Sequence, residues 1–168
     1  TMLLGDLELQ QGDLPAAIDA WQRIESQNPA FLSLVAERLA DAYRRQGANA
    51  QAQRVLGAYQ QQYPSLDLLN TVFTLTLAEE GSEAAGTLIK DELTRNPTLL
   101  GLDRLLEAQL LVAPAERRHD LELVKQLVGR HIKRLGLYKC DQCGFRARQY
   151  YWRCPGCGKW ETYSPRRT

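Results

Sequence analysis

The 168-residue sequence predicts an all-α solenoid of helix hairpins that ends in a small four-cysteine metal-binding module. The segment QGDLPAAIDAWQRIESQNP, which ends at Pro29, recurs as QGANAQAQRVLGAYQQQYP, which ends at Pro64, 35 residues further on. The four cysteines of the chain form two CxxC pairs within residues 140–157. A repeat of this length is typical of a solenoid, and paired CxxC motifs are typical of a metal site.

Turn, small and large residues recur in phase along the repeats. Gly12 and Gly47 are placed to end the first helix of each hairpin, because glycine readily adopts the positive φ that closes such a turn. Ala17 is small enough to let two helices cross closely, and Trp21 is large enough to fill the seam beside it. The matching positions of the second copy are Ala52 and Leu56.

A third, looser copy is EGSEAAGTLIKDELTRNP, which ends at Pro97, 33 residues after Pro64. Proline cannot continue a helix, so Pro29, Pro64 and Pro97 are expected to end the second helix of each hairpin. The three copies resemble the tetratricopeptide repeat, a helix–turn–helix unit of about 34 residues. We therefore expect tetratricopeptide-type helical repeats over residues 1–113.

The pattern changes after Pro97. Residues 98–113 read as a helix that is broken at Ala113 and Pro114, and residues 115–135 read as a longer amphipathic helix that ends at Gly136. Its apolar residues follow the helical period, and they are Leu121, Val124, Leu127, Val128, Ile132 and Leu135. We expect a capping or connecting helix over residues 114–137 and a metal-binding module with its tail over residues 138–168.

The first helices of such a solenoid usually line a concave groove. The repeat phase places four charged side chains of the second hairpin on that side: Glu37, Asp41, Arg44 and Arg45. They form either an ordinary solvated helix face or a groove for an extended or helical segment of a partner protein.

Cys140, Cys143, Cys154 and Cys157 follow the pattern C-x2-C-x10-C-x2-C. Two thiolates separated by two residues can approach one ion from a single tight turn, and two such turns complete a tetrahedron. Gly144 and Gly158 follow the second cysteine of each pair, where positive φ lets backbone N–H groups point at sulfur. The sequence therefore predicts one metal ion bound by four cysteines, without a catalytic site.

The two knuckles, YKCDQCGF and WRCPGCGKW, resemble those of a rubredoxin, in which four cysteines can hold iron and transfer electrons. Four thiolates accept zinc or iron. Only ten residues separate the knuckles here, far fewer than in free rubredoxins, and the lost segment would supply much of the small core and the acidic partner-binding face. The shortened module favours structural zinc, with a redox-active iron site as the alternative.

Nucleic-acid binding is the second alternative for the module. Residues 138–168 carry seven basic and two acidic side chains, whereas residues 1–137 carry 14 basic and 18 acidic ones. Basic and aromatic side chains interleaved in this way can stack on bases. The net charge of +1 for the whole chain is a weak electrostatic footprint, so we expect no nucleic-acid partner.

A module this small lacks a core of its own and should pack against the helices. We expect Trp152 and Tyr150 or Tyr151 to contact the helical body, with the apolar face of helix 115–135 and the mildly acidic repeats as the nearest surfaces.

A tetratricopeptide array followed by a shortened rubredoxin-like knuckle pair resembles the lipopolysaccharide assembly protein B family of Gram-negative bacteria. The resemblance spans the whole chain, and the knuckle sequence is its most specific element. It identifies the chain as the C-terminal part of such a protein, without the N-terminal transmembrane helix and the earlier repeats of the family. The metal ligands of the family correspond to Cys140, Cys143, Cys154 and Cys157.

The resemblance implies a non-catalytic adaptor on the cytoplasmic face of the bacterial inner membrane, held there by an N-terminal anchor absent from this chain. Its implied partners are the membrane protease FtsH, the deacetylase LpxC and the lipopolysaccharide assembly machinery. The adaptor would promote degradation of LpxC by FtsH and so regulate lipopolysaccharide biosynthesis. No protease, kinase or transferase motif is present in the sequence, in agreement with such a role.

Overall fold

The computed structural model describes residues 1–135 and 137–165. The predicted helix end at Gly136 and residues 166–168 of the predicted tail lie outside this part of the chain, as does the side chain of Leu135. The helices are α1 (Met2–Gln11), α2 (Leu14–Gln22), α3 (Ile24–Gln27), the 3-10 helix η1 (Pro29–Phe31), α4 (Leu32–Arg45), α5 (Asn49–Gln62), α6 (Leu66–Glu80), α7 (Ser82–Arg95), α8 (Leu99–Val112) and α9 (Ala115–Leu135). Two short antiparallel strands follow, β1 (Tyr138–Lys139) and β2 (Arg146–Ala147).

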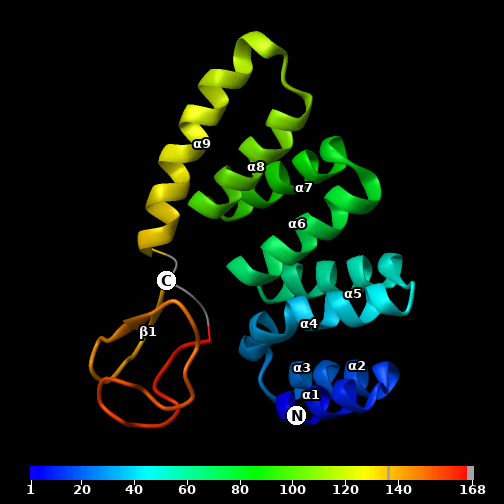
Figure 1. Ribbon diagram of the computed structural model, residues 1–168, viewed down its shortest axis with the longest axis vertical. Coiled ribbons are helices and arrows are strands. Elements are labelled where there is room, and N and C mark those ends of the chain that lie inside the picture. The colour runs from blue at the N-terminus through cyan, green and yellow to red at the C-terminus, as the bar shows by residue number, and fades with distance from the viewer. Residues whose placement is uncertain (136, 166–168) are drawn as a thin grey trace.

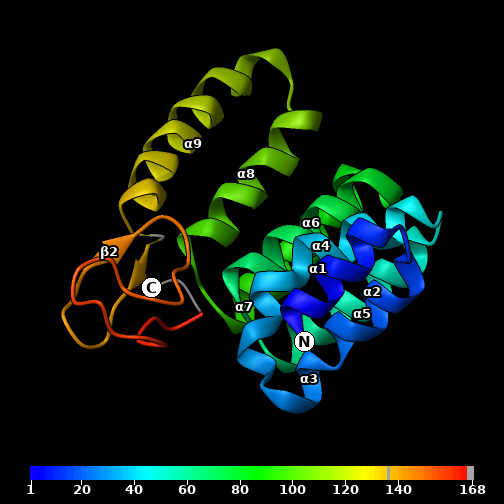
Figure 2. The same cartoon turned by 60° about the horizontal axis from the view of Figure 1, so that its bottom comes forward.

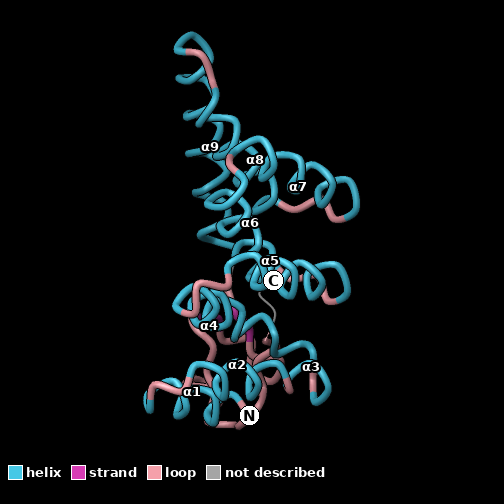
Figure 3. The backbone as a smooth tube through the Cα atoms, turned by 90° about the vertical axis from the view of Figure 1, so that its right-hand side faces the viewer, coloured by secondary structure: helices cyan, strands magenta, loops and turns pink. Residues whose placement is uncertain are grey.

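Successive helices form hairpins that stack along the long axis of the molecule (Figures 1 and 3). Within the stack α1 packs on α2, α4 on α5, α6 on α7 and α8 on α9. Neighbouring hairpins are joined by contacts between α2 and α4, between α4 and α6, and between α6 and α8. The predicted class, an α-helical array with a C-terminal four-cysteine knuckle module, is confirmed.

The glycines at the hairpin turns have the conformation that the repeat pattern predicts. Gly12 has φ 85° and Gly47 has φ 70°, both in the left-handed region. After α1, the Gly12 N–H donates to Leu9 O and the Asp13 N–H donates to Glu8 O, at 3.1 and 3.0 Å. These bonds satisfy carbonyl groups that the helix end would otherwise leave free, and they reverse the chain into α2.

The paired small and large residues form the core of the first hairpins. Ala17, Trp21, Ala52 and Leu56 are fully buried in one apolar cluster that extends from α2 to α6. A second cluster under α6, α7 and α8 contains Phe73 and four further buried residues, Leu69, Ala85, Ile89 and Ala108.

The second helix of the first hairpin differs from the expectation of one helix up to Pro29. It is interrupted at Arg23 (φ −60°, ψ −16°) and resumes as the four-residue α3. Asn28 then takes an extended conformation, and its side chain accepts from the Ala30 N–H at 3.2 Å. This cap starts η1 at Pro29, and Phe31 at the end of η1 is half-buried against the first apolar cluster.

The helix α9 runs back along the stack and carries the cysteine module to the side of α4 and η1 (Figures 1 and 2). Its 21 residues give it a length of about 31 Å at 1.5 Å per residue. Within the described residues, no helix combines the length and apolar character needed to cross a membrane.

Candidate metal centre

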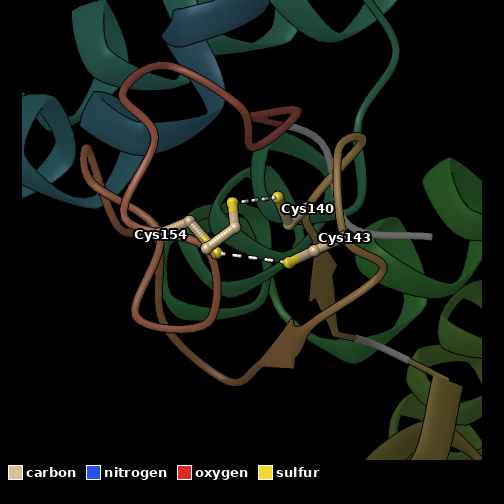
Figure 4. A group of neighbouring side chains, drawn as sticks. Cys140, Cys143 and Cys154 are labelled. Carbon is tan, nitrogen blue, oxygen red and sulfur yellow. Dashed lines mark hydrogen bonds between the residues drawn. The ribbon is translucent and has the colours of Figure 1, made fainter.

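The four cysteines converge on one point in the module. Cys140, Cys143 and Cys154 are seen pointing toward a common centre in Figure 4. The sulfur atoms of Cys140, Cys143, Cys154 and Cys157 all lie within 4.8 Å of one another. Cys140 and Cys154 are buried, with 0% and 2% of their surface exposed, whereas Cys143 faces the solvent.

The two knuckles have the same backbone construction. In the first, the Gly144 N–H donates to Cys140 O and the Cys140 N–H donates to Phe145 O, both at 2.9 Å. In the second, the Gly158 N–H donates to Cys154 O at 2.9 Å and the Cys154 N–H donates to Lys159 O at 2.8 Å. Gly144 and Gly158 have φ values of 74° and 71°, so each turn needs a residue that tolerates the left-handed region.

The sulfur spacing fits a tetrahedral ion. Cys140 Sγ lies 3.9 Å from Cys157 Sγ, and Cys143 Sγ lies 3.6 Å from Cys154 Sγ. A metal–sulfur distance of about 2.3 Å gives a tetrahedral edge of about 3.8 Å between sulfurs. The residues present therefore fit one metal ion held by four thiolates, a donor set that accepts zinc or iron.

Hydrogen bonds around the buried sulfurs favour the thiolate form. Burial raises the pKa of the Cys140 thiol, but hydrogen bonds to the Thr162 hydroxyl and to the backbone N–H groups of Cys143 and Gln142 outweigh it and bring the pKa to about 6. For Cys154, burial is likewise outweighed by backbone N–H groups, and its pKa is lowered. The Gly156 N–H donates to Cys154 Sγ at 3.3 Å.

Cys143 behaves in the opposite way. The backbone N–H of Phe145 lowers its pKa, but burial and the three neighbouring sulfurs raise the pKa to about 12. Four sulfurs this close cannot all carry a negative charge without a cation, so protons remain on some of them. A divalent ion supplies that cation and displaces the protons.

An aromatic cluster joins the module to the first hairpins. The Phe31 ring stacks on Trp152, with centroids 5.6 Å apart and planes 7° apart, and meets Tyr150 edge-on at 6.2 Å. Tyr150 in turn meets Trp152 edge-on at 5.1 Å. Tyr151 packs within the module instead, against Tyr163, with ring centroids 6.2 Å apart.

Further contacts lie at the start of α4. The Ser33 hydroxyl donates to Pro165 O at 3.1 Å, and Leu34 packs against the small core of the module. That core consists of Tyr138, Cys140, Cys154 and Tyr163. The other expected surface is the apolar face of helix 115–135, where Val124 and Leu127 remain 43% and 50% exposed. The module therefore packs on the beginning of the array.

The charged residues predicted to face a groove lie between α4 and α6. Glu37, Asp41 and Arg44 line a hollow of about 240 Å³, together with Asn70 and neighbouring residues of α6. Arg45 lies beside it and donates to Asp41 at 2.7 Å. Asp41 also pairs with Arg44.

Sequence reasoning missed Phe31, Thr162 and Tyr163. Thr162 contacts a cysteine sulfur and Tyr163 lies in the core of the module, but both follow the last cysteine and carry no motif. Phe31 lies 121 residues before its stacking partner Trp152, and no sequence pattern links the two. Its place two residues after Pro29 shows only that it lies near a helix boundary.

Comparison with known proteins agrees with this geometry. Residues 138–165 match the family described as the rubredoxin metal binding domain. The matched segment contains both knuckles and the residues that pack around them.

Similarity to curated proteins extends over nearly the whole chain. It is 29% identical over 166 residues to lipopolysaccharide assembly protein B of Escherichia coli K12, covering 98% of this chain and 43% of that protein. It is 25% identical to the protein of the same name from Haemophilus influenzae, covering 98% of this chain and 42% of that protein. The chain thus spans less than half the length of these relatives. Residues 138–165 are a rubredoxin-like metal-binding domain, on a chain that resembles lipopolysaccharide assembly protein B along nearly all of its length.

Proposed function

We propose that this chain is a non-catalytic adaptor that acts in lipopolysaccharide assembly. The observation that carries the proposal is the similarity to lipopolysaccharide assembly protein B over 98% of the chain, which includes both the helices and the metal module. The donor set supports a structural metal, because the four sulfurs can complete a tetrahedron by themselves and leave no position for a substrate.

The finer role is regulation of lipopolysaccharide biosynthesis through proteolysis. In this proposal the adaptor promotes degradation of the deacetylase LpxC by the membrane protease FtsH, at the cytoplasmic face of the inner membrane. A groove lined by Glu37, Asp41 and Arg44 supports a protein partner, since charged side chains around a concave surface can orient a bound segment. The family resemblance supplies the identity of the partners.

The metal module supports this function by fixing the shape of the array. It contacts the first hairpins through Phe31 and Ser33 while it is joined to the last hairpin through α9. Loss of the ion would release the knuckles and with them the aromatic contacts, because so small a module has little core of its own.

The test is Cys140→Ser combined with Cys143→Ser in cells that carry the full-length protein. We expect LpxC to accumulate and lipopolysaccharide output to rise, because two of the four ligands are lost. LpxC is measured by immunoblot after protein synthesis is stopped, and lipopolysaccharide by gel staining.

The matched control is Asp141→Ser, which lies between the same two cysteines, is exposed and contributes no ligand. It should leave LpxC turnover unchanged. Unchanged turnover in the double cysteine variant, at equal protein level, would show that the module is not needed for the proposed role.

A further inference from the structure

The helix α9 has two apolar faces, and α8 covers one of them. Leu121, Val128 and Ile132 are half-buried on the side of α8. Leu123, Val124 and Leu127 lie on another side and are 52%, 43% and 50% exposed. At about 100° per residue, Leu123 and Leu127 are only about 40° apart around the helix axis, so they form one continuous strip. We call Leu123, Val124 and Leu127 the outer strip.

Opposite charges stand at the two ends of the outer strip. Asp120 precedes Leu123 by three residues, and Arg130 follows Leu127 by three residues. Neither has an ion-pair partner within the described part of the chain. Lys125, on the α8 side, is by contrast paired with Asp103 at 3.0 Å. The strip therefore combines exposed apolar side chains with free charges whose sign reverses along the helix.

This pattern is complementary to itself when the helix is turned end for end. We propose that the outer strip of α9 is a self-association surface, on which a second copy of this chain packs its own α9 in the antiparallel direction. A two-fold axis near residue 125 places Leu123 of each copy against Leu127 of the other, and Asp120 against Arg130. The 3-4-3 spacing of these four residues matches the seam along which paired helices pack.

The charges and the position of the module both favour the antiparallel direction. Parallel packing would place Asp120 beside Asp120 and Arg130 beside Arg130, which is repulsive. It would also place both metal modules together at one end of the helices. In the antiparallel pair the modules lie at opposite ends of helices about 31 Å long, because each module follows the C-terminal end of its own α9 (Figure 1).

Sedimentation of the metal-loaded chain over roughly a hundredfold range of concentration tests the proposal. The wild-type chain should form a dimer whose fraction rises with concentration, since the apolar area of the strip is small and the association weak. Leu127→Glu should raise the dissociation constant at least about tenfold, because it places charge at the centre of the contact. The matched control is Leu99→Glu on α8, which is 40% exposed and outside the strip, and it should dimerise as the wild type does.

Charge reversal tests the antiparallel register. Asp120→Arg and Arg130→Asp should each weaken dimerisation when alone, since each brings like charges together. An equimolar mixture of these two variants should associate as tightly as the wild type, and so should the double variant. Circular dichroism and metal content verify that each variant is folded.

A wild-type chain that stays monomeric over the whole range would overturn the proposal. So would single reversals without effect, or a double variant as weak as the single ones. Association that survives Leu127→Glu would place the contact between copies elsewhere on the molecule.

Discussion

At the scale of single residues, Gly5 has the least space for a side chain among the described glycines, because Trp21 lies against it. A Cβ atom on Gly5 would lie 2.3 Å from Trp21 Nε1. The indole is fully buried and its N–H donates to Met2 O at 3.3 Å, so the ring is held from both sides. The absence of a side chain at Gly5 is therefore what allows α1 to approach α2.

We predict that Gly5→Ala lowers the free energy of unfolding by about 1–3 kcal/mol, because the added methyl group must displace the Trp21 ring or separate the two helices. Urea denaturation followed by tryptophan fluorescence measures the change.

Gly57→Ala is the matched control. Gly57 also lies inside a helix, but a Cβ atom there would meet nothing within 4 Å. The substitution should raise stability by about 0.5–1 kcal/mol, because alanine loses less backbone freedom than glycine on folding. Equal effects of the two substitutions would contradict the packing argument.

Residue types alone predict the metal ligands, because the spacing of the cysteines restricts how they can be arranged around an ion. They do not predict that Thr162 contacts Cys140, or that Phe31 stacks on Trp152. Those contacts depend on where the chain returns in space, and a threonine or phenylalanine has many uses in a protein.

At the scale of elements, a buried tyrosine of α5 makes the stability of the fold depend on pH. Tyr59 is 6% exposed, and burial followed by the nearby charge of Glu25 raises its pKa from 10.0 to about 12. The folded state therefore holds the phenol proton more tightly than the unfolded state does. The resulting stabilisation is fully present below pH 10 and is lost as the pH rises from 10 to 12.

We predict that Tyr59→Phe makes stability less dependent on pH between 10 and 12, since phenylalanine has no proton to lose. The difference between the variants should change by up to about 2 kcal/mol across that interval. Urea denaturation at several alkaline pH values gives the slope. A slope equal to that of the wild type would assign the alkaline loss to other groups.

The helix α9 shows how far sequence periodicity can place an element. The period predicts a helix over residues 115–135, and the structure has α9 over Ala115–Leu135. The predicted stripe, however, combined residues of two faces, since Leu121 is half-buried toward α8 while Leu127 is exposed. Apolar residues 80–120° apart can belong to one wide face or to two narrow ones, and only the position of α8 decides between them.

At the scale of the whole molecule, the metal module connects the two ends of the array. It follows α9 and contacts Phe31 of η1 as well as Ser33 and Leu34 in the first turn of α4. The order of elements along the chain could be predicted, but this long-range contact could not, because it depends on the length and direction of α9.

We predict that removing the metal increases hydrogen exchange at η1 and the first turn of α4 as well as in the module. The cause is loss of the Phe31–Trp152 stack once the knuckles open. Exchange followed by mass spectrometry, before and after chelation, measures this change, and elemental analysis of the untreated protein identifies the ion.

Trp152→Ala separates contact from coordination. Its side chain stacks on Phe31 and is no ligand, so the variant should keep the metal but show the faster exchange at residues 29–34. Exchange there that responds to neither change would show that the module does not protect the first hairpins.

The return path of α9 has a mechanical consequence. An open array of helix hairpins deforms like a spring, because each hairpin touches only its neighbours and small rotations add up along the stack. Here α9 and the module form a second connection between the last hairpin and the first ones, in addition to the stack itself. Stretching or straightening the array must break the aromatic contacts at Phe31, so the compliance of the whole molecule depends on four sulfur atoms that lie outside the helices.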